Sequence, residues 1–84
     1  MTAATLRSTL EARYDPQYLD LERLQANLVE TDEAKAKDEE ALPALAVSEP
    51  TLAIQARSNI AMYERQIEEL RTLIAIKREW DDAN

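Results

Sequence analysis

The sequence predicts an all-α protein, a long antiparallel helical hairpin that resembles a coiled coil in its apolar spacing. Three observations predict this fold class: the 84 residues include no glycine, the apolar residues repeat at helical spacing, and two of the three prolines stand where a helix would begin. Glycine usually supplies the positive φ angles of tight β-hairpin turns and phosphate-binding loops. Without it, the expected architecture is helix joined to helix in a single helical domain, 1–84.

The first third of the chain predicts two helical segments. Residues 2–14 form a short amphipathic helix, with apolar residues three or four positions apart: Ala3, Leu6, Leu10 and Tyr14. Asp15 then provides an N-cap and Pro16 a first helical residue, which predicts a helix over 16–40. Its apolar face carries Tyr18, Leu21, Leu24 and Leu28. The two segments are either one helix kinked at Pro16 or two helices that meet there.

Pro43 predicts that residues 41–49 connect the two arms of the hairpin, because proline lacks an N–H and cannot continue a helix smoothly. The segment is unusually apolar for a connector, since residues 42–47 read LPALAV. It is either an exposed plug that inserts into a neighbour or a cap on the end of the hairpin. As a cap, it folds three side chains over Ala53 and Ile54, namely those of Leu42, Leu45 and Val47.

The second arm is a long helix over 50–82, starting at Pro50. Its apolar residues alternate steps of three and four, as in an a/d heptad seam: Ala53, Ala56, Ile60, Tyr63, Ile67, Leu70 and Ile74. A second apolar line lies beside this seam towards the carboxyl end, formed by Leu73, Ile76 and Trp80. Folding the chain at 41–49 places Leu28 beside Ile60 and Tyr63, and makes a rod roughly 50 Å long.

The second apolar line predicts an interaction surface, because each helix of a hairpin has only one neighbour. Copies of the chain, a larger assembly or segment 2–14 folded back as a third helix can each cover it. The expected protein interface therefore comprises Leu73, Ile76 and Trp80, with Tyr63, Ile67 and Leu70 as its inner seam. Trp80 is either an interface anchor or a lid that closes the hairpin against Leu6 and Leu10.

Composition argues against an enzyme. The chain has no histidine and no cysteine, which are the usual general base, thiolate nucleophile and metal or haem ligands. We therefore expect no catalytic residues, no metal, no cofactor and no small-molecule substrate.

The net charge of −7 is concentrated between Val29 and Glu49, where seven acidic residues stand against two basic ones. No basic stripe is present for phosphate contacts, so neither direct nucleic-acid binding nor an anionic membrane surface is expected. The acidic run is either a solvated helix face that keeps the chain soluble or a functional surface. In the second case its candidate residues are Asp38, Glu39 and Glu40.

The leading hypothesis is a non-catalytic structural or interaction protein, a small acidic hairpin that serves a larger assembly through an apolar helix face. Virion components, secretion complexes and their co-chaperones are built in this way. The partner is another protein or a second copy of the chain, and a cytoplasmic location is expected, with incorporation into a larger particle as one possibility. The alternative is an acidic inhibitor that blocks a basic groove on an enzyme or a nucleic-acid-binding protein.

Overall fold

The computed structural model describes residues 2–84, apart from the side chain of Ala3, and confirms the all-α prediction. The elements follow in the order α1 (Ala3–Arg13), a 3₁₀ turn η1 (Pro16–Tyr18), α2 (Leu21–Ser48) and α3 (Pro50–Ala83). The described residues form no strand, and none of them has a positive φ angle.

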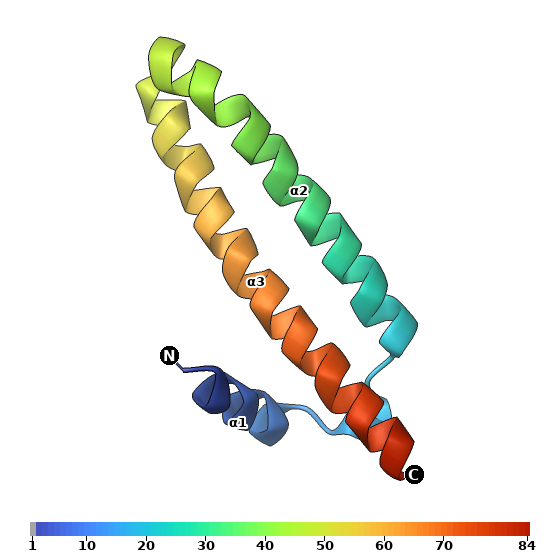
Figure 1. Cartoon of the computed structure of the whole chain (residues 1–84). Helices are drawn as coiled ribbons and strands as arrows, with labels where there is room; N and C mark the ends of the chain where they lie inside the picture. The colour runs from blue at the N-terminus through green and yellow to red at the C-terminus, as the bar shows by residue number, and fades with distance from the viewer. Residues whose placement is uncertain (1) are drawn as a thin grey trace.

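The long helices α2 and α3 run antiparallel as a rod, and the short α1 lies across one end of α3 (Figure 1). The molecule measures 54 × 25 × 14 Å and its radius of gyration is 15.9 Å, against about 12 Å for a compact domain of this length. We call the end that holds residues 42–54 the tip, and the opposite end, where α1 and η1 lie against α3, the base.

Segments 2–14 and 16–40 meet as separate elements at Pro16. Tyr14 is extended and ends α1, and the Asp15 side chain accepts a hydrogen bond from the Gln17 amide at 3.1 Å. Pro16 begins only the single turn of η1, so α2 starts five residues later than expected. Its N-cap is Asp20, which accepts a hydrogen bond from the Arg23 amide at 3.3 Å.

The predicted connector 41–49 is wrong, because α2 continues through Pro43 to Ser48. Proline removes one N–H from the helix interior, but the alanine and leucine residues around it favour helix strongly. Leu42 and Leu45 are also partly buried, so packing against α3 contributes to holding this last stretch helical. Glu49 alone, with φ −144° and ψ 77°, connects the two arms, and Pro50 begins α3 as expected.

The later turn also shifts the alignment of the two arms. Leu28 was expected beside Ile60 and Tyr63, but it lies with Arg71 and Ile74 around one surface depression. Lys35 is level with Glu64, at a distance of 3.9 Å between Nζ and Oε1. The predicted pairing was therefore displaced by about two and a half helical turns along α3.

The heptad seam of α3 does face α2, since all seven of its residues are buried or partly buried. The main core lies at the base, where a leucine from α1 joins residues of α2 and α3: Leu10, Leu24, Leu73, Ile74 and Ile76. Towards the tip only two small side chains are buried, those of Ala53 and Ala56. Most of the apolar burial therefore needs the third helix.

Candidate interaction surfaces

Most of the predicted interface lies inside the molecule. Leu73 and Ile76, the centre of the expected second line, are 7% and 5% exposed, because α1 folds back and covers them. Ile67 is buried, and Tyr63 and Leu70 are partly buried in the seam. The expected interface at Leu73 and Ile76 is thus corrected: α1 covers both residues, which is the third of the alternatives that the sequence left open.

Trp80 stays at the surface, with 36% of its area exposed. Its ring lies under the ammonium group of Lys77, 4.7 Å from the ring centroid. Lys77 also donates a hydrogen bond to the carbonyl of Pro16 at 3.1 Å and pairs with Asp81 at 3.2 Å. Because these contacts join η1 to the last turns of α3, this site stabilises the base of the hairpin.

A second ion pair fixes α1 to α3. The Arg7 guanidinium binds both carboxylate oxygens of Glu79, with 3.3 Å between Nη1 and Oε1, and it also pairs with Glu11 within α1. The hydrogen bond from Arg7 lowers the pKa of Glu79, and the same bond raises the pKa of Arg7. Both side chains are solvated, which limits what this pair adds to stability.

The candidate acidic face is less uniform than the sequence indicates. Glu40 is exposed, but Glu39 lies 3.7 Å from Lys35, which offsets its charge. One carboxylate oxygen of Asp38 is buried and has no hydrogen-bond partner among the described residues. The three residues therefore do not form one freely solvated negative surface.

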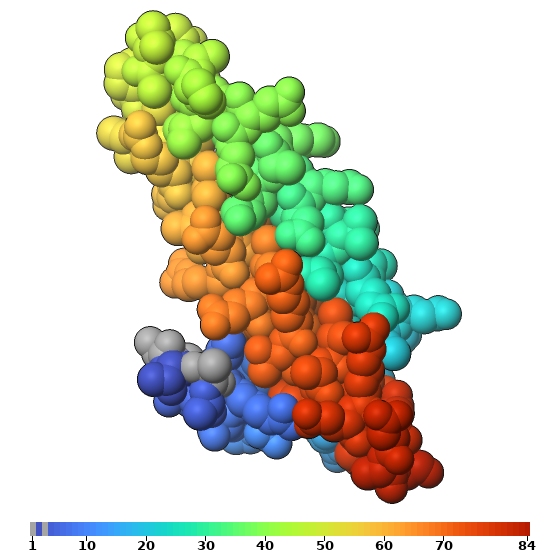
Figure 2. All heavy atoms as spheres, viewed as in Figure 1, coloured from blue at the N-terminus to red at the C-terminus, as the bar shows by residue number. Residues whose placement is uncertain are grey.

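The tip carries exposed apolar side chains, one of which, Val47, belongs to the segment that the sequence offered as either an exposed plug or a cap. Val47 is 87% exposed, Ile54 65% and Leu52 50%, and Figure 2 shows α1 far from this end. Of the three side chains expected to form a cap, Leu42 and Leu45 are partly buried and Val47 is exposed, and so is Ile54, which the cap was expected to cover. The sequence indicates this surface by its lack of charge, since Glu49 is the single charged residue in 42–54.

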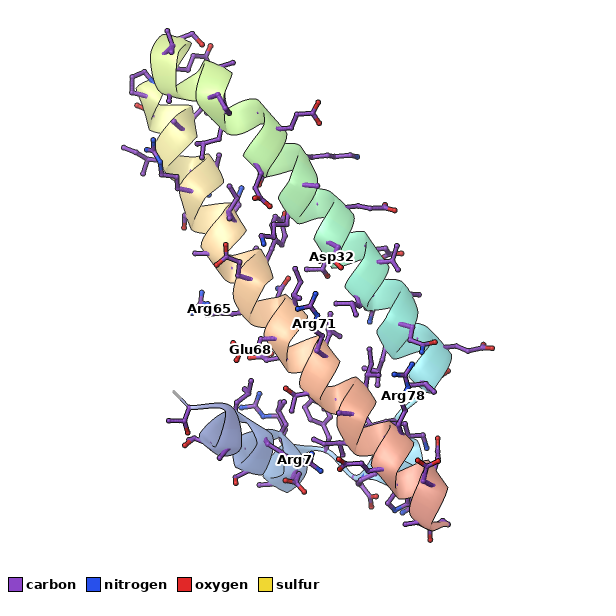
Figure 3. The ribbon with its side chains drawn as sticks, in the orientation of Figure 1. Arg7, Asp32, Arg65, Glu68, Arg71 and Arg78 are labelled. Carbon is purple, nitrogen blue, oxygen red and sulfur yellow. The ribbon has the colours of Figure 1, made fainter. Side chains whose placement is uncertain are left out.

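A shallow groove runs between α2 and α3 on one broad face. Its base half is a depression of about 400 Å³ over Leu28, Val29 and Ile74, flanked by Arg71 and Arg78. A larger depression of about 750 Å³ continues it towards the tip and includes Asp32, Lys35 and Glu64, and Arg7 of α1 also lines it. Figure 3 shows Arg71 and Arg78 leaving α3 on the side of α2, with Asp32 on the facing side of α2.

Residues 2–84 hold no group of three acidic, histidine or cysteine side chains arranged to bind a metal ion. Within the same residues, no helix combines the length and the apolar character needed to cross a membrane.

Comparison of the chain with protein-family models, with curated proteins and with solved structures gives no match. Any functional argument therefore depends on the surfaces described above.

Proposed function

We propose that this chain is a non-catalytic interaction protein, a small acidic helical hairpin that acts as a component or adaptor of a larger protein assembly. The observation that carries the proposal is the apolar tip, formed by Val47, Leu52 and Ile54. Water-exposed aliphatic side chains gathered at one end of an otherwise charged rod are typical of a surface that another protein covers.

The size of the tip favours a concave partner. The cross-section of the rod is at most 25 × 14 Å, or roughly 350 Å², less than half of the ~800 Å² that each partner buries in a stable interface. A flat end-to-end contact between two tips is therefore too small. A socket that also surrounds the first turns of α3 and the last turns of α2 provides more area, and its lining is apolar because the tip offers one charge.

Site-specific photocrosslinking in the cells that produce the protein tests this function. A photoreactive residue in place of Leu52 should give a discrete adduct with one protein, and Val47→Ser with Ile54→Ser in the same chain should abolish it. The matched control carries the same probe in place of Glu33, an exposed residue of α2 that points away from α3 by helical spacing. An equal adduct from the Glu33 position, or none from Leu52, contradicts docking through the tip.

The acidic inhibitor remains the alternative, and the same assay separates it. If the acidic face binds the partner, replacing Asp38, Glu39 and Glu40 by serine abolishes the adduct and the tip substitutions leave it intact. Added salt also weakens an acidic contact strongly, whereas it has little effect on an apolar socket. The neutralisation of Glu39 by Lys35 favours the tip.

A further inference from the structure

The base half of the α2/α3 groove combines an apolar floor with positive charge. Leu28, Val29 and Ile74 form the floor, and the charged side chains that line this depression within 2–84 are those of Arg71 and Arg78. Neither arginine forms an ion pair with a residue in the described chain. In a chain of net charge −7, two unpaired guanidinium groups beside an apolar floor point to a ligand that is both acidic and apolar.

The larger depression next to it has no such preference. Its lining includes three basic and three acidic side chains, so it selects neither sign of charge. Arg7, which α1 contributes, is already bound to Glu79, and Lys35 lies near Glu64. Arg71 lines both depressions. The unpaired positive charge of the groove is therefore that of Arg71 and Arg78, at its base half.

Arg71, Ile74 and Arg78 lie on one face of α3 at steps of three and four residues, and both arginines leave α3 on the side of α2 (Figure 3). The arginines are two helical turns apart, or about 10 Å along the helix axis. A second helix along the groove matches this face if two acidic residues stand seven positions apart, with aliphatic residues three and four positions after the first. The acids then reach the arginines, and the aliphatic side chains cover Val29 and Ile74.

We propose that the base half of this groove binds an amphipathic helix of a second protein, in which two acidic residues seven positions apart enclose aliphatic residues. Each carboxylate accepts hydrogen bonds from one guanidinium group, Arg71 or Arg78. The aliphatic residues remove the side chain of Val29, which is 56% exposed, from water. The bound helix packs against α2 and α3 at the usual interaxial distance of about 8–10 Å, as a further member of the bundle.

A second copy of this chain does not carry the required pattern. Within α1, α2 and α3, two pairs of acids stand seven residues apart, Asp32 with Glu39 and Glu33 with Glu40. In each pair, the residues three and four positions after the first acid are an alanine and a lysine. The lysine would lie against the two arginines, and like charges in contact oppose binding. The partner is therefore a different protein.

Acidic side chains beyond the ends of the site restrict the ligand further. Glu68 lines the larger depression, and Asp82 stands four residues after Arg78 without forming an ion pair in 2–84. Negative charge outside the two acids would be repelled by these carboxylates, so a long phosphate polyanion fits poorly. This inference goes beyond the proposed function and does not depend on it, although an adaptor that joins two proteins needs a second surface besides the tip.

Titration of the full chain with a synthetic peptide tests the proposal. The probe is an end-capped peptide of about 20 residues, rich in alanine and glutamine and long enough to form helix on its own. It carries two glutamates seven positions apart, with leucines three and four positions after the first. Fluorescence anisotropy should give a Kd below about 1 mM, and a peptide with glutamines in place of the two glutamates should bind at least about tenfold more weakly.

Substitutions in the chain locate the binding. Arg71→Glu with Arg78→Glu should raise the Kd at least about tenfold, and this variant should prefer a peptide with lysines in place of the glutamates. Val29→Ser, at an exposed position, should raise the Kd about threefold because it removes an apolar contact. The control Arg23→Glu with Lys37→Glu changes the net charge equally at exposed positions of α2 away from the groove and should leave the Kd within about twofold. Circular dichroism checks that every variant keeps its helicity.

Absence of binding at about 1 mM peptide overturns the proposal, as does equal affinity for the glutamine peptide. A charge-reversed chain that does not prefer the lysine peptide, or a Val29→Ser chain with an unchanged Kd, also contradicts it. A single-stranded DNA that displaces the peptide at equal concentration would show a phosphate site instead. Because the photocrosslinking readout depends on the tip and this titration depends on Arg71, Arg78 and Val29, each proposal can fail without the other.

Discussion

The base and the tip of the hairpin share the same two helices and the same heptad seam, yet they differ in how much they bury. At the base, α1 covers the outer side of α3, so Leu73 and Ile76 are 7% and 5% exposed. At the tip no third element is present, and Leu52 and Ile54 remain at least half exposed. Two packed helices therefore bury one line of side chains each, and a second line stays exposed to water unless another helix covers it.

The largest effect should come from truncating a leucine at the base, with a leucine at the tip truncated for comparison. Leu73→Ala removes methyl groups from the packed base and should lower the free energy of unfolding by about 2–4 kcal/mol. Leu52→Ala removes the same atoms from an exposed position and should change it by less than ~0.5 kcal/mol. Urea denaturation followed by circular dichroism, at one protein concentration, measures both. Equal losses would mean that the tip is covered in solution.

Pro43→Ala should have an intermediate effect, in the stabilising direction. An amide at position 43 restores the hydrogen bond to the carbonyl of Glu39 and removes the clash of the ring with that carbonyl. We expect a gain of about 1–3 kcal/mol in the same denaturation experiment. Ser48→Ala, near the end of α2, is the control: it also raises helix propensity, removes only an exposed hydrogen bond to the carbonyl of Ala44, and should change little. A loss of stability in Pro43→Ala would show that the ring itself packs at the tip.

Glu79→Gln should give the smallest effect, limited to the attachment of α1 at the base. The folded pKa of Glu79 is lowered by Arg7, so the ionised form contributes stability above its ordinary pKa of 4.5. That contribution is lost as the pH falls through the folded pKa. The melting temperature of the variant should therefore lie slightly below that of the unchanged chain at neutral pH and converge with it in acid. Asp82→Asn, which removes a charge outside any ion pair in 2–84, should show no such convergence.

The periodicity of α3 correctly predicted which of its faces is buried, because a regular seam such as Ile60, Ile67 and Ile74 depends only on helical geometry. The predicted connector was wrong because it considered Pro43 alone. The helix-forming residues around Pro43, and the partial burial of Leu42 and Leu45, outweigh the effect of the proline. That single error displaced the alignment of the arms. Tyr18 was assigned to the apolar face of the predicted helix 16–40 but is 81% exposed, since η1 rather than a full helix follows Pro16.

The candidate surfaces were harder to predict because burial depends on tertiary contacts. Leu73 and Ile76 have the pattern of an interface in the sequence, and nothing local distinguishes cover by α1 from cover by another protein. Val47 lies in the segment that the sequence already offered as a plug, but its grouping with Ile54 became recognisable only when the turn was placed at Glu49. Arg71 of α3 and Asp32 of α2 line one depression. Because they lie on different helices, their proximity can be known only from the alignment of the two arms.

The single-residue connection at Glu49 gives the hairpin the mechanics of a pair of hinged levers. Each arm extends up to about 50 Å from that residue, so a rotation of ~10° at its backbone would separate the far ends by about 9 Å. Restraints act most effectively at the greatest distance from a hinge, and the contacts of Arg7 with Glu79 and of Lys77 with Pro16 lie at that distance. A few modest bonds at the base therefore oppose opening of the arms with a leverage that the same bonds near the tip would lack.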